Sequence, residues 1–261
     1  MKHLLYYVSL ILGVLFFLRV ASYADIIECD SIDELKAVMQ DKLKNRVIQF
    51  NIHLTAELSF FEVDNVLAQV FDEIVAEDDY LRFSYQSYQH KWKGHDNGIT
   101  INITMKYRTT QKQEIQISQK ISALLEQIIL YDMDDVEKVK HIHNWIVRNV
   151  CYDTSHSNYS TYSALFHGTA VCQGYALLMH RMLQEASIKS NIIAGYSKGL
   201  VHIWNMAYID GEWYHVDVTY DDPIGNEKSK VIYKYFMISD AEIAKDHSWD
   251  RELYPEARIS L

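Results

Sequence analysis

The stretch from Gly168 to Pro223 constrains the fold most, because it predicts a helix and a hairpin that carry three reactive side chains. Cys172 stands just before an apolar run whose three- and four-residue spacing is typical of one helix face. The run consists of Tyr175, Leu178, Met179, Met182, Leu183 and Ala186. Cys172 should therefore lie in the first helical turn, after a loop and a cap supplied by Gly168 and Thr169. Unpaired backbone N–H groups and the helix dipole favour an anion there, so a thiol in such a turn ionises more readily than a free one.

A hairpin is predicted after this helix, because the strand-like runs GLVHIWNMAYI and EWYHVDVTY flank the dipeptide Asp210-Gly211. Asp-Gly is typical of a two-residue type I′ turn between antiparallel strands. Such a turn pairs Ile209 with Glu212 and fixes the register of both strands.

In this register His202 and Asp217 lie on the same face of the sheet as diagonal neighbours. Trp204 is then opposite Asp217, and His202 is opposite Thr219. A three-residue loop would shift the pairing by one and put His202 and Asp217 on opposite faces, so the geometry depends on the turn.

A thiol at a helix start, a histidine on one strand and an aspartate on the next make a Cys-His-Asp relay of nucleophile, base and orienting acid. The segments GTAVCQGYA and HIWNMAYIDGEWYHVDVTYDDP resemble the transglutaminase-like superfamily at all three positions. With the segments YKYFMISD and DHSWD, the resemblance covers roughly residues 131 to 258. It implies an α+β fold with a transglutaminase-like (papain-like) core, in which the nucleophile helix packs on an antiparallel sheet. It also implies the catalytic residues Cys172, His202 and Asp217.

The same resemblance implies a side-chain hydrogen-bond donor upstream of Cys172. Together with the backbone N–H of Cys172, this donor would stabilise the oxyanion that forms when the thiol attacks a carbonyl group. Tyr162 is our candidate for this donor, with Trp145 second, although a structural role suits both residues equally well. Four further histidines fall outside the position where the family carries its base, and we assign them no role. They are His156, His167, His180 and His215.

Each member of the relay also has an ordinary structural interpretation. A single cysteine is usually a small buried apolar group, a single histidine can be a satisfied core residue, and a single aspartate can simply end a strand. The motif around each residue and the predicted convergence of the three favour catalysis. A metal-dependent hydrolase with Cys172, His202 and Asp217 as ligands is a further alternative, which metal analysis would test.

Residues 1–24 are predicted to be a signal peptide or a membrane anchor. Lys2 and His3 precede an apolar run from Leu4 to Leu18, and the segment Ser22-Tyr23-Ala24 offers small residues at the two positions that a signal peptidase reads. The run is short for a spanning helix of about 20 residues. We therefore expect a secreted or cell-envelope, extracytoplasmic protein that meets the membrane only through residues 1–24 if they are not cleaved.

Composition argues against a nucleic-acid partner. Loss of residues 1–24 would remove Lys2 and Arg19 but no acid, which leaves 23 basic and 35 acidic residues and a formal charge of −12. Nucleic-acid binding demands a basic patch. Hydrophobic residues make up 49% of the chain, enough for a packed core.

The chain then divides into a small α/β module at residues 25–111 and a catalytic domain at residues 112–261. In the module we expect helices from Ser31 to Lys44 and from Glu62 to Glu77. The expected strands are Val47–Leu54, Tyr80–Tyr88 and Ile99–Arg108, the last two around a polar turn at residues 93–98. In the domain, helices are expected at Gln113–Leu130 and Asp134–Asn149, and residues Val231–Ile238 should add an edge strand. Asp221 and Asp222 are expected to form a turn.

Metal and disulfide signals are weak. His141 and His143, two residues apart on a predicted helix, point in different directions and cannot share an ion through that helix. The cysteine spacing fits no zinc ribbon or finger, and we predict neither a metal nor another cofactor. Cys29 and Cys151 could form a disulfide, but nothing in the sequence brings them together.

The predicted function is an extracytoplasmic enzyme that acts on amide or peptide bonds through a thioester. It would be a peptidase, an amidase or a cross-linking acyltransferase, and its partner a protein or peptide substrate such as a cell-envelope peptide. The alternative is a non-catalytic envelope-binding module that keeps the fold.

Overall fold

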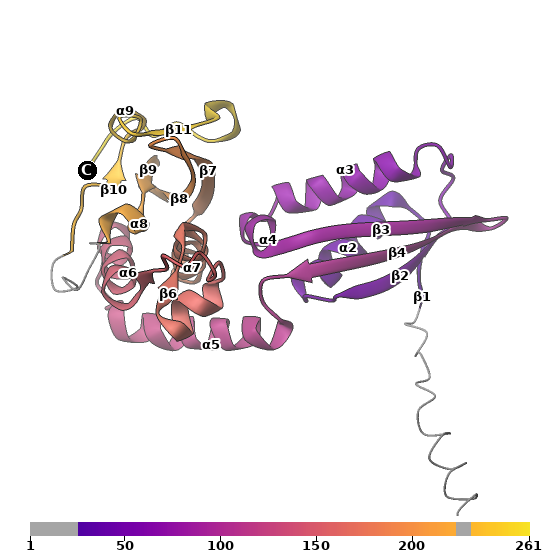
Figure 1. Cartoon of the computed structure of the whole chain (residues 1–261), viewed down its shortest axis with the longest axis horizontal. Coiled ribbons are helices and arrows are strands. Elements are labelled where there is room, and N and C mark those ends of the chain that lie inside the picture. Colours follow the sequence, from indigo (N-terminus) through magenta and orange to yellow (C-terminus); the bar gives the residue numbers. More distant parts are fainter. Residues whose placement is uncertain (1–25, 223–230) are drawn as a thin grey trace, which may run out of the picture.

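The computed structural model describes residues 26–222 and 231–261 and contains two units, each built on its own sheet (Figure 1). The N-terminal unit has a four-stranded sheet of order β1-β2-β4-β3, in which β1 and β2 are parallel and the other pairs antiparallel. Its elements are β1 (Ile26–Cys29), α2 (Ile32–Lys44), β2 (Gln49–Leu54), α3 (Val63–Ala76), α4 (Asp79–Ser84), β3 (Tyr85–His95) and β4 (Gly98–Tyr107).

The alternating apolar residues of β2 and β4 build the core of this unit. Phe50 pairs with Ile103 and Ile52 with Ile101, so their side chains share one face of the sheet, and all four are buried. Helices α2 and α3 contribute their apolar stripes to the same cluster. The prediction of two helices and a sheet with one buried and one solvent-exposed face is therefore confirmed.

Two details of the module were predicted wrongly. Residues Tyr80–Ser84 form the end of helix α4 and not the start of a strand, because the Asp78 side chain caps the helix by accepting from the Leu81 N–H. The following hairpin is longer than predicted, since β3 runs to His95 and β4 starts at Gly98. Gly98 has φ 138°, and a Cβ atom there would meet the Leu54 carbonyl oxygen at 2.4 Å, so this position requires glycine.

The C-terminal unit has a five-stranded antiparallel sheet of order β10-β9-β8-β7-β11 (Figure 1). A small parallel pair, β5-β6, lies apart from it. Before the sheet come α5 (Gln111–Ile128), α6 (Asp135–Asn149), β5 (Cys151–Tyr152), the π-helix η1 (Ser163–His167), β6 (Thr169–Ala170) and α7 (Cys172–Glu185). The remaining elements are β7 (Ser190–Ser197), β8 (Leu200–Ile209), β9 (Glu212–Val216), α8 (Val218–Asp221), β10 (Phe236–Ile238), α9 (Asp240–Ile243), β11 (His247–Trp249) and the 3₁₀ helix η2 (Arg251–Leu253).

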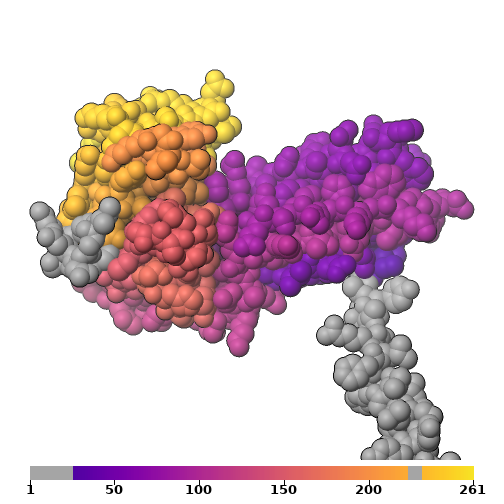
Figure 2. Space-filling model, viewed as in Figure 1, coloured from indigo at the N-terminus to yellow at the C-terminus, as the bar shows by residue number. Residues whose placement is uncertain are grey.

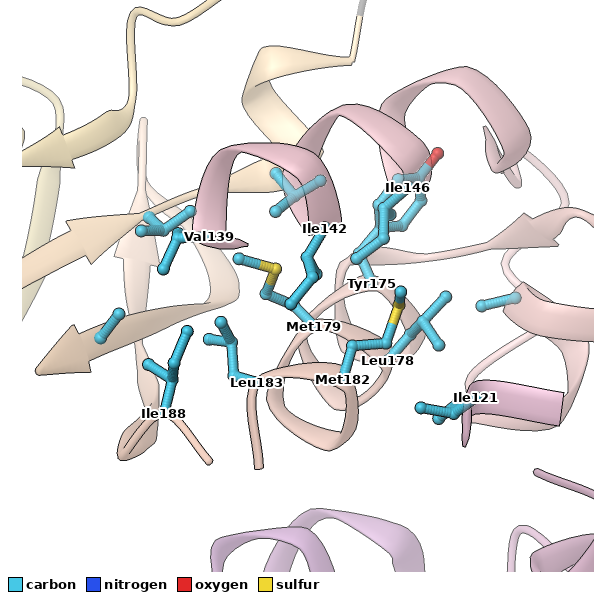
Figure 3. Close-up of a cluster of buried hydrophobic side chains, with 14 of the residues drawn as sticks. Ile121, Val139, Ile142, Ile146, Tyr175, Leu178, Met179, Met182, Leu183 and Ile188 are labelled. Carbon is cyan, nitrogen blue, oxygen red and sulfur yellow. The ribbon is translucent and has the colours of Figure 1, made fainter. Parts of the chain in front are cut away.

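Helix α7 is the centre of this unit, because every residue from Gly174 to His180 is buried, as are Met182 and Leu183. Figure 3 shows Tyr175, Leu178, Met179, Met182 and Leu183 of α7 among side chains of α5, α6 and the segment before β7. The predicted helix face is thus confirmed. Burial on this scale, at about 25 cal/mol per Å² of apolar surface, makes α7 a rigid support for the residue at its start.

The hairpin has the predicted register as far as β9 extends. Ile209 pairs with Glu212, and Asp210 and Gly211 both have positive φ, at 50° and 89°, as a type I′ turn requires. The predicted pairing of His202 with Thr219 is wrong, because β9 ends at Val216 and Asp217 starts helix α8.

The predicted turn at Asp221 and Asp222 is the end of helix α8, with Asp221 as its last residue and Asp222 as its C-cap, and both side chains are buried. Asp221 ends α8, where its Oδ2 lies 3.1 Å from His143 Nε2 of α6. Asp222 accepts a hydrogen bond of 2.6 Å from the Tyr175 hydroxyl of α7. These buried bonds tie α8 to two helices at once.

The N-terminal unit packs against α7 through its short helix α4. Tyr80 of α4 is buried in one cluster with Ala176, Leu177, Ile192 and Ile203, and Phe83 and Cys172 pack against this cluster. Hydrogen bonds also cross this boundary, for example from Gln173 Nε2 to the Phe83 carbonyl and from the Ile192 N–H to Asp79. The space-filling view in Figure 2 shows the indigo-to-magenta unit in direct contact with the remainder. The first unit therefore borders the start of the nucleophile helix.

The C-terminal segment supplies both edges of the second sheet. The predicted edge strand is observed as β10, shorter than expected, beside β9, and β11 pairs with β7 at the other edge. The predicted signal or anchor, residues 1–24, lies outside the described residues. Of the helices that are described, none is long and apolar enough to cross a bilayer.

Candidate active site

Cys172 is the first residue of α7, as predicted, and its side chain is partly exposed. The residue before it, Val171, occupies the N-cap position and offers no side-chain acceptor, so the predicted cap from Thr169 is wrong. Thr169 lies in β6 instead, while Gly168 makes the turn with a left-handed backbone, φ 65°. The backbone N–H groups of Cys172 and Gln173 lie in the first turn of α7, where a helix offers them no acceptor, whereas the Gly174 N–H donates to the Val171 carbonyl.

His202 and Asp217 meet across the end of the hairpin. His202 Nε2 lies 2.7 Å from Asp217 Oδ2, and both side chains are buried, with 7% and 0% of each residue exposed. Asp217 reaches this position although it is no longer on the strand, because it starts α8 directly after β9. The bond to Nε2 leaves Nδ1 as the ring nitrogen available to the Cys172 thiol.

Asp217 is fixed by four hydrogen-bond partners. Its Oδ1 accepts from the backbone N–H groups of Thr219 and Tyr220 at 3.0 and 3.2 Å. Its Oδ2 lies 2.7 Å from His202 Nε2 and 3.1 Å from His247 Nε2. A carboxylate offers about four lone-pair positions, so the side chain is fully satisfied in one orientation.

The electrostatics favour a charged His202. Burial opposes the imidazolium and is the largest single effect, but the charge and hydrogen bond of Asp217, followed by Cys172, outweigh it and raise the pKa of His202. Burial likewise opposes the Asp217 carboxylate, yet His202 and His247 together lower the pKa of Asp217. The pair is therefore an imidazolium beside a carboxylate at neutral pH, and the imidazolium stabilises a thiolate at Cys172.

Aromatic rings enclose the histidine. Trp204 stacks on His202 with ring centroids 5.9 Å apart, and Tyr220 approaches its edge at 4.8 Å. Trp204 is itself held by a hydrogen bond from its Nε1 to His215 Nδ1, and His215 Nε2 lies 2.8 Å from Asp240. His215, to which the sequence analysis assigned no role, thus fixes the ring that packs on the base.

His247 is the site residue that sequence reasoning missed. It belongs to β11, and its other ring nitrogen, Nδ1, lies 2.7 Å from Asp246 Oδ1. The signal was present in the motif DHSWD, which contributed to the family resemblance but was not examined for chemistry. Its position beside Asp217 depends on pairing of β11 with β7, which no local pattern fixes.

The two tyrosines upstream of Cys172 differ in their surroundings. Tyr162 stacks on Phe166 with centroids 4.5 Å apart and meets His167 edge-on, so its role as oxyanion donor stays a prediction. Tyr152 lies on β5, and its pKa is raised, mainly by burial and further by the neighbouring Cys172 and Tyr220. Its side chain is 38% exposed and accessible to a ligand.

Ligand atoms of His202, Asp217 and His247 lie within 4.8 Å of one another, a set that could hold a metal ion. Both Nε2 atoms point at the same carboxylate oxygen, however, and the hydrogen bonds already explain this arrangement. Cys172 is not part of the set. His141 is exposed and His143 is buried against Asp221, so this pair does not converge, as the sequence analysis expected.

All three cysteines lie within the described residues and are free thiols. Cys29 is buried in the N-terminal core, whereas Cys151 is exposed on β5. The disulfide between them, left open by the sequence, is therefore not formed in this structure.

A cysteine at a helix start, beside a histidine on an antiparallel sheet and an aspartate directly after the next strand, is the arrangement expected of transglutaminase-like and cysteine protease-like proteins. Comparison with known proteins agrees: residues 122–218, which contain Cys172, His202 and Asp217, match the model of the transglutaminase-like superfamily. The chain thus contains a transglutaminase-like domain, and the predicted α+β fold class is confirmed.

Two curated relatives share 26% identity with the chain, and both are named kyphoscoliosis peptidase. The protein of Mus musculus aligns over 163 residues, 53% of this chain and 24% of its own length. That of Homo sapiens aligns over 186 residues, 60% of this chain and 28% of its own. The chain thus spans about a quarter of the length of these relatives. Among solved structures, a crystal structure of a TGase has a TM-score of 0.40 at 13% identity, covering 74% of this chain and 59% of that one.

Proposed function

We propose that the chain is a cysteine-nucleophile enzyme that acts on amide or peptide bonds through a thioester. The observation that carries this proposal is the buried pair of His202 and Asp217, 2.7 Å apart, beside a partly exposed thiol at the start of α7. Pairing of this kind converts a weak nucleophile into a thiolate.

In the first half of the reaction, the Cys172 thiolate attacks the carbonyl carbon of the substrate. The carbonyl oxygen becomes an oxyanion in the tetrahedral intermediate, and His202 gives its proton to the leaving nitrogen as the C–N bond breaks. A thioester on Cys172 and a free amine or ammonia result. Asp217 keeps the His202 ring in one orientation and stabilises its charged form.

Two donors suit the oxyanion. One is the backbone N–H of Cys172, which has no acceptor inside the helix because it lies in the first turn. The other is the Tyr152 hydroxyl, which neighbours Cys172 and carries its proton at neutral pH, as an ordinary tyrosine does. Tyr162, the donor proposed from sequence, has its contacts on the side of Phe166 and His167.

In the second half, water or an amine attacks the thioester. We favour water, and hence hydrolysis of a peptide substrate, because both curated relatives are named peptidases. We further propose an extracytoplasmic site of action from the apolar pattern of residues 4–18.

The test is the rate of iodoacetamide alkylation as a function of pH, with peptide mapping of the labelled cysteines. Cys151, an exposed thiol, is an internal reference in every sample. We expect Cys172 to react much faster than Cys151 down to about pH 6. The His202→Ala variant should lose this advantage, since its thiolate has no cation beside it.

Equal rates for Cys172 and Cys151 in the folded wild-type chain would contradict the enzyme proposal. They would leave the non-catalytic binding module as the better explanation. Stoichiometric zinc in purified protein would instead favour the metal-dependent alternative.

A further inference from the structure

His247 lies where it can control the catalytic pair without touching a substrate. It comes from the C-terminal segment, pairs through β11 with Ser197 of β7, and is buried. Its two ring nitrogens both face carboxylate oxygens, Nε2 at 3.1 Å from Asp217 and Nδ1 at 2.7 Å from Asp246. A carboxylate therefore holds this ring from each side.

We propose that His247 is a positioning residue that shares the Asp217 carboxylate with His202 and acts on the reaction through it. An ionised carboxylate only accepts hydrogen bonds, so both nitrogens of His247 are satisfied together only when both carry a proton. His247 is then a cation between two anions, and the sequence of charges from Asp246 through His247 and Asp217 to His202 alternates. This inference rests on the proposed function.

Asp246 is well placed to hold His247 in this form. Its Oδ2 accepts a 2.5 Å hydrogen bond from the Tyr235 hydroxyl and lies 3.8 Å from Lys234 Nζ, so the carboxylate is anchored on its far side. Its backbone carbonyl accepts from the Lys198 N–H and the Ser197 hydroxyl of the β7 hairpin. The C-terminal segment is therefore docked at the same point where it supplies His247.

The remaining groups around His247 are aromatic rings, among which His202 is a charged imidazolium. Rings of Trp204 and His202 on β8, Tyr220 on α8 and Tyr235 before β10 lie between 5.1 and 5.4 Å from it by centroid distance. The pKa of His215 on β9 is lowered, mainly by burial and against the effect of Asp240, and the nearby His247 lowers it further. The carboxylates of Asp217 and Asp246 therefore dominate the electrostatic surroundings of the His247 ring.

Two consequences follow for Asp217. The bond from His247 fills the fourth acceptor position of the carboxylate, which fixes the orientation that His202 needs. The positive charge of His247 also offsets part of the attraction between Asp217 and the His202 imidazolium. His202 consequently releases its proton to a leaving amine more readily than it would beside an unshared aspartate.

The experiment is an NMR titration of the His202 ring in the whole chain, beside alkylation of Cys172. His247→Gln keeps a hydrogen-bond donor but removes the charge, so the His202 midpoint should rise by about one pH unit. His247→Ala removes the bond as well, and Cys172 alkylation should slow at least about tenfold. His180→Gln is the matched control, since His180 is a buried histidine of α7 bonded to Ser190.

An unchanged His202 midpoint in folded His247→Gln would overturn the proposal, as would the same shift in His180→Gln. Asp246→Asn offers a second route should the glutamine variant not fold. Asparagine keeps an acceptor oxygen but lacks the negative charge that favours the His247 cation, so the titration midpoint of His202 should also rise. The titration needs no reactive thiol. If Cys172 of the wild-type chain reacts no faster than Cys151, and the titration midpoint of His202 still shifts in His247→Gln, the enzyme proposal is refuted and the role of His247 is left intact.

Discussion

Replacing His143 by alanine should destabilise the fold far more than replacing His141, although the two lie two residues apart on α6. His143 and Asp221 both have side chains with 0% exposure, and their Nε2 and Oδ2 atoms are 3.1 Å apart. Removal of one partner from a buried ion pair lowers the free energy of unfolding by about 3–5 kcal/mol, because the other charge is left buried without a partner. His141 is exposed, and its loss should change the free energy of unfolding by less than about 0.5 kcal/mol.

The measurement is urea denaturation of both variants at neutral and mildly acidic pH. Burial already raises the pKa of Asp221 and His143 opposes this, so without His143 the carboxyl should take up a proton more easily. Protonation removes the unpaired negative charge of Asp221. The loss of unfolding free energy in His143→Ala should therefore become smaller as the pH falls. Equal stabilities of the two variants, or a deficit that does not change with pH, would refute this explanation.

Two further outcomes test the site itself. The folded-state pKa of His202 is raised to about 9 from an ordinary value of 6.5, so its stabilising effect should be complete below about pH 6.5 and lost as the pH rises through 9. The difference in unfolding free energy between wild type and His202→Ala should accordingly fall by up to about 3 kcal/mol over this range, and a constant difference would exclude the pair as its source. Tyr152→Phe should slow acylation of Cys172 by p-nitrophenyl acetate about 100-fold and leave alkylation by iodoacetamide unchanged, because only acylation forms an oxyanion. Tyr162→Phe is its matched control, and a larger effect there would restore the donor predicted from sequence.

The parts of the site that local chemistry determines could be predicted from the sequence. The apolar spacing after Cys172 placed the thiol at a helix start, and Asp210-Gly211 fixed the turn and with it the pairing of Ile209 with Glu212. Both signals act over a few residues, where propensity and turn geometry decide the backbone.

The prediction failed where a side chain competed with the backbone pattern. Tyr80 to Ser84 are aromatic and apolar enough for a strand, but the Asp78 side chain caps a helix there. Asp217 likewise ends β9, because its carboxylate accepts from two N–H groups ahead of it and starts α8. Side-chain capping of this kind depends on one residue, so a prediction based on the apolar pattern of a longer segment does not detect it.

His247 could not be placed from sequence for a different reason. It is 30 residues from Asp217 along the chain, and their meeting depends on a tail that returns to the far edge of the sheet. The contacts that dock this tail, such as the Lys198 N–H on the Asp246 carbonyl, are tertiary and leave no period in the sequence.

The distance between nucleophile and acid is set by the same buried bonds that hold α8. Tyr175 lies one helical turn after Cys172 and donates to Asp222, the residue that follows α8, at 2.6 Å. Asp217 is the cap at the other end of α8, so one side-chain bond links the helix of the thiol to the helix of the carboxylate. Because α8 is only four residues long, movement at Asp222 must move Asp217. The bond between Tyr175 and Asp222 therefore stabilises α8 and aligns Asp217 with His202 at the same time. A mutation that removes the Tyr175 hydroxyl should misalign His202, although Tyr175 does not contact it.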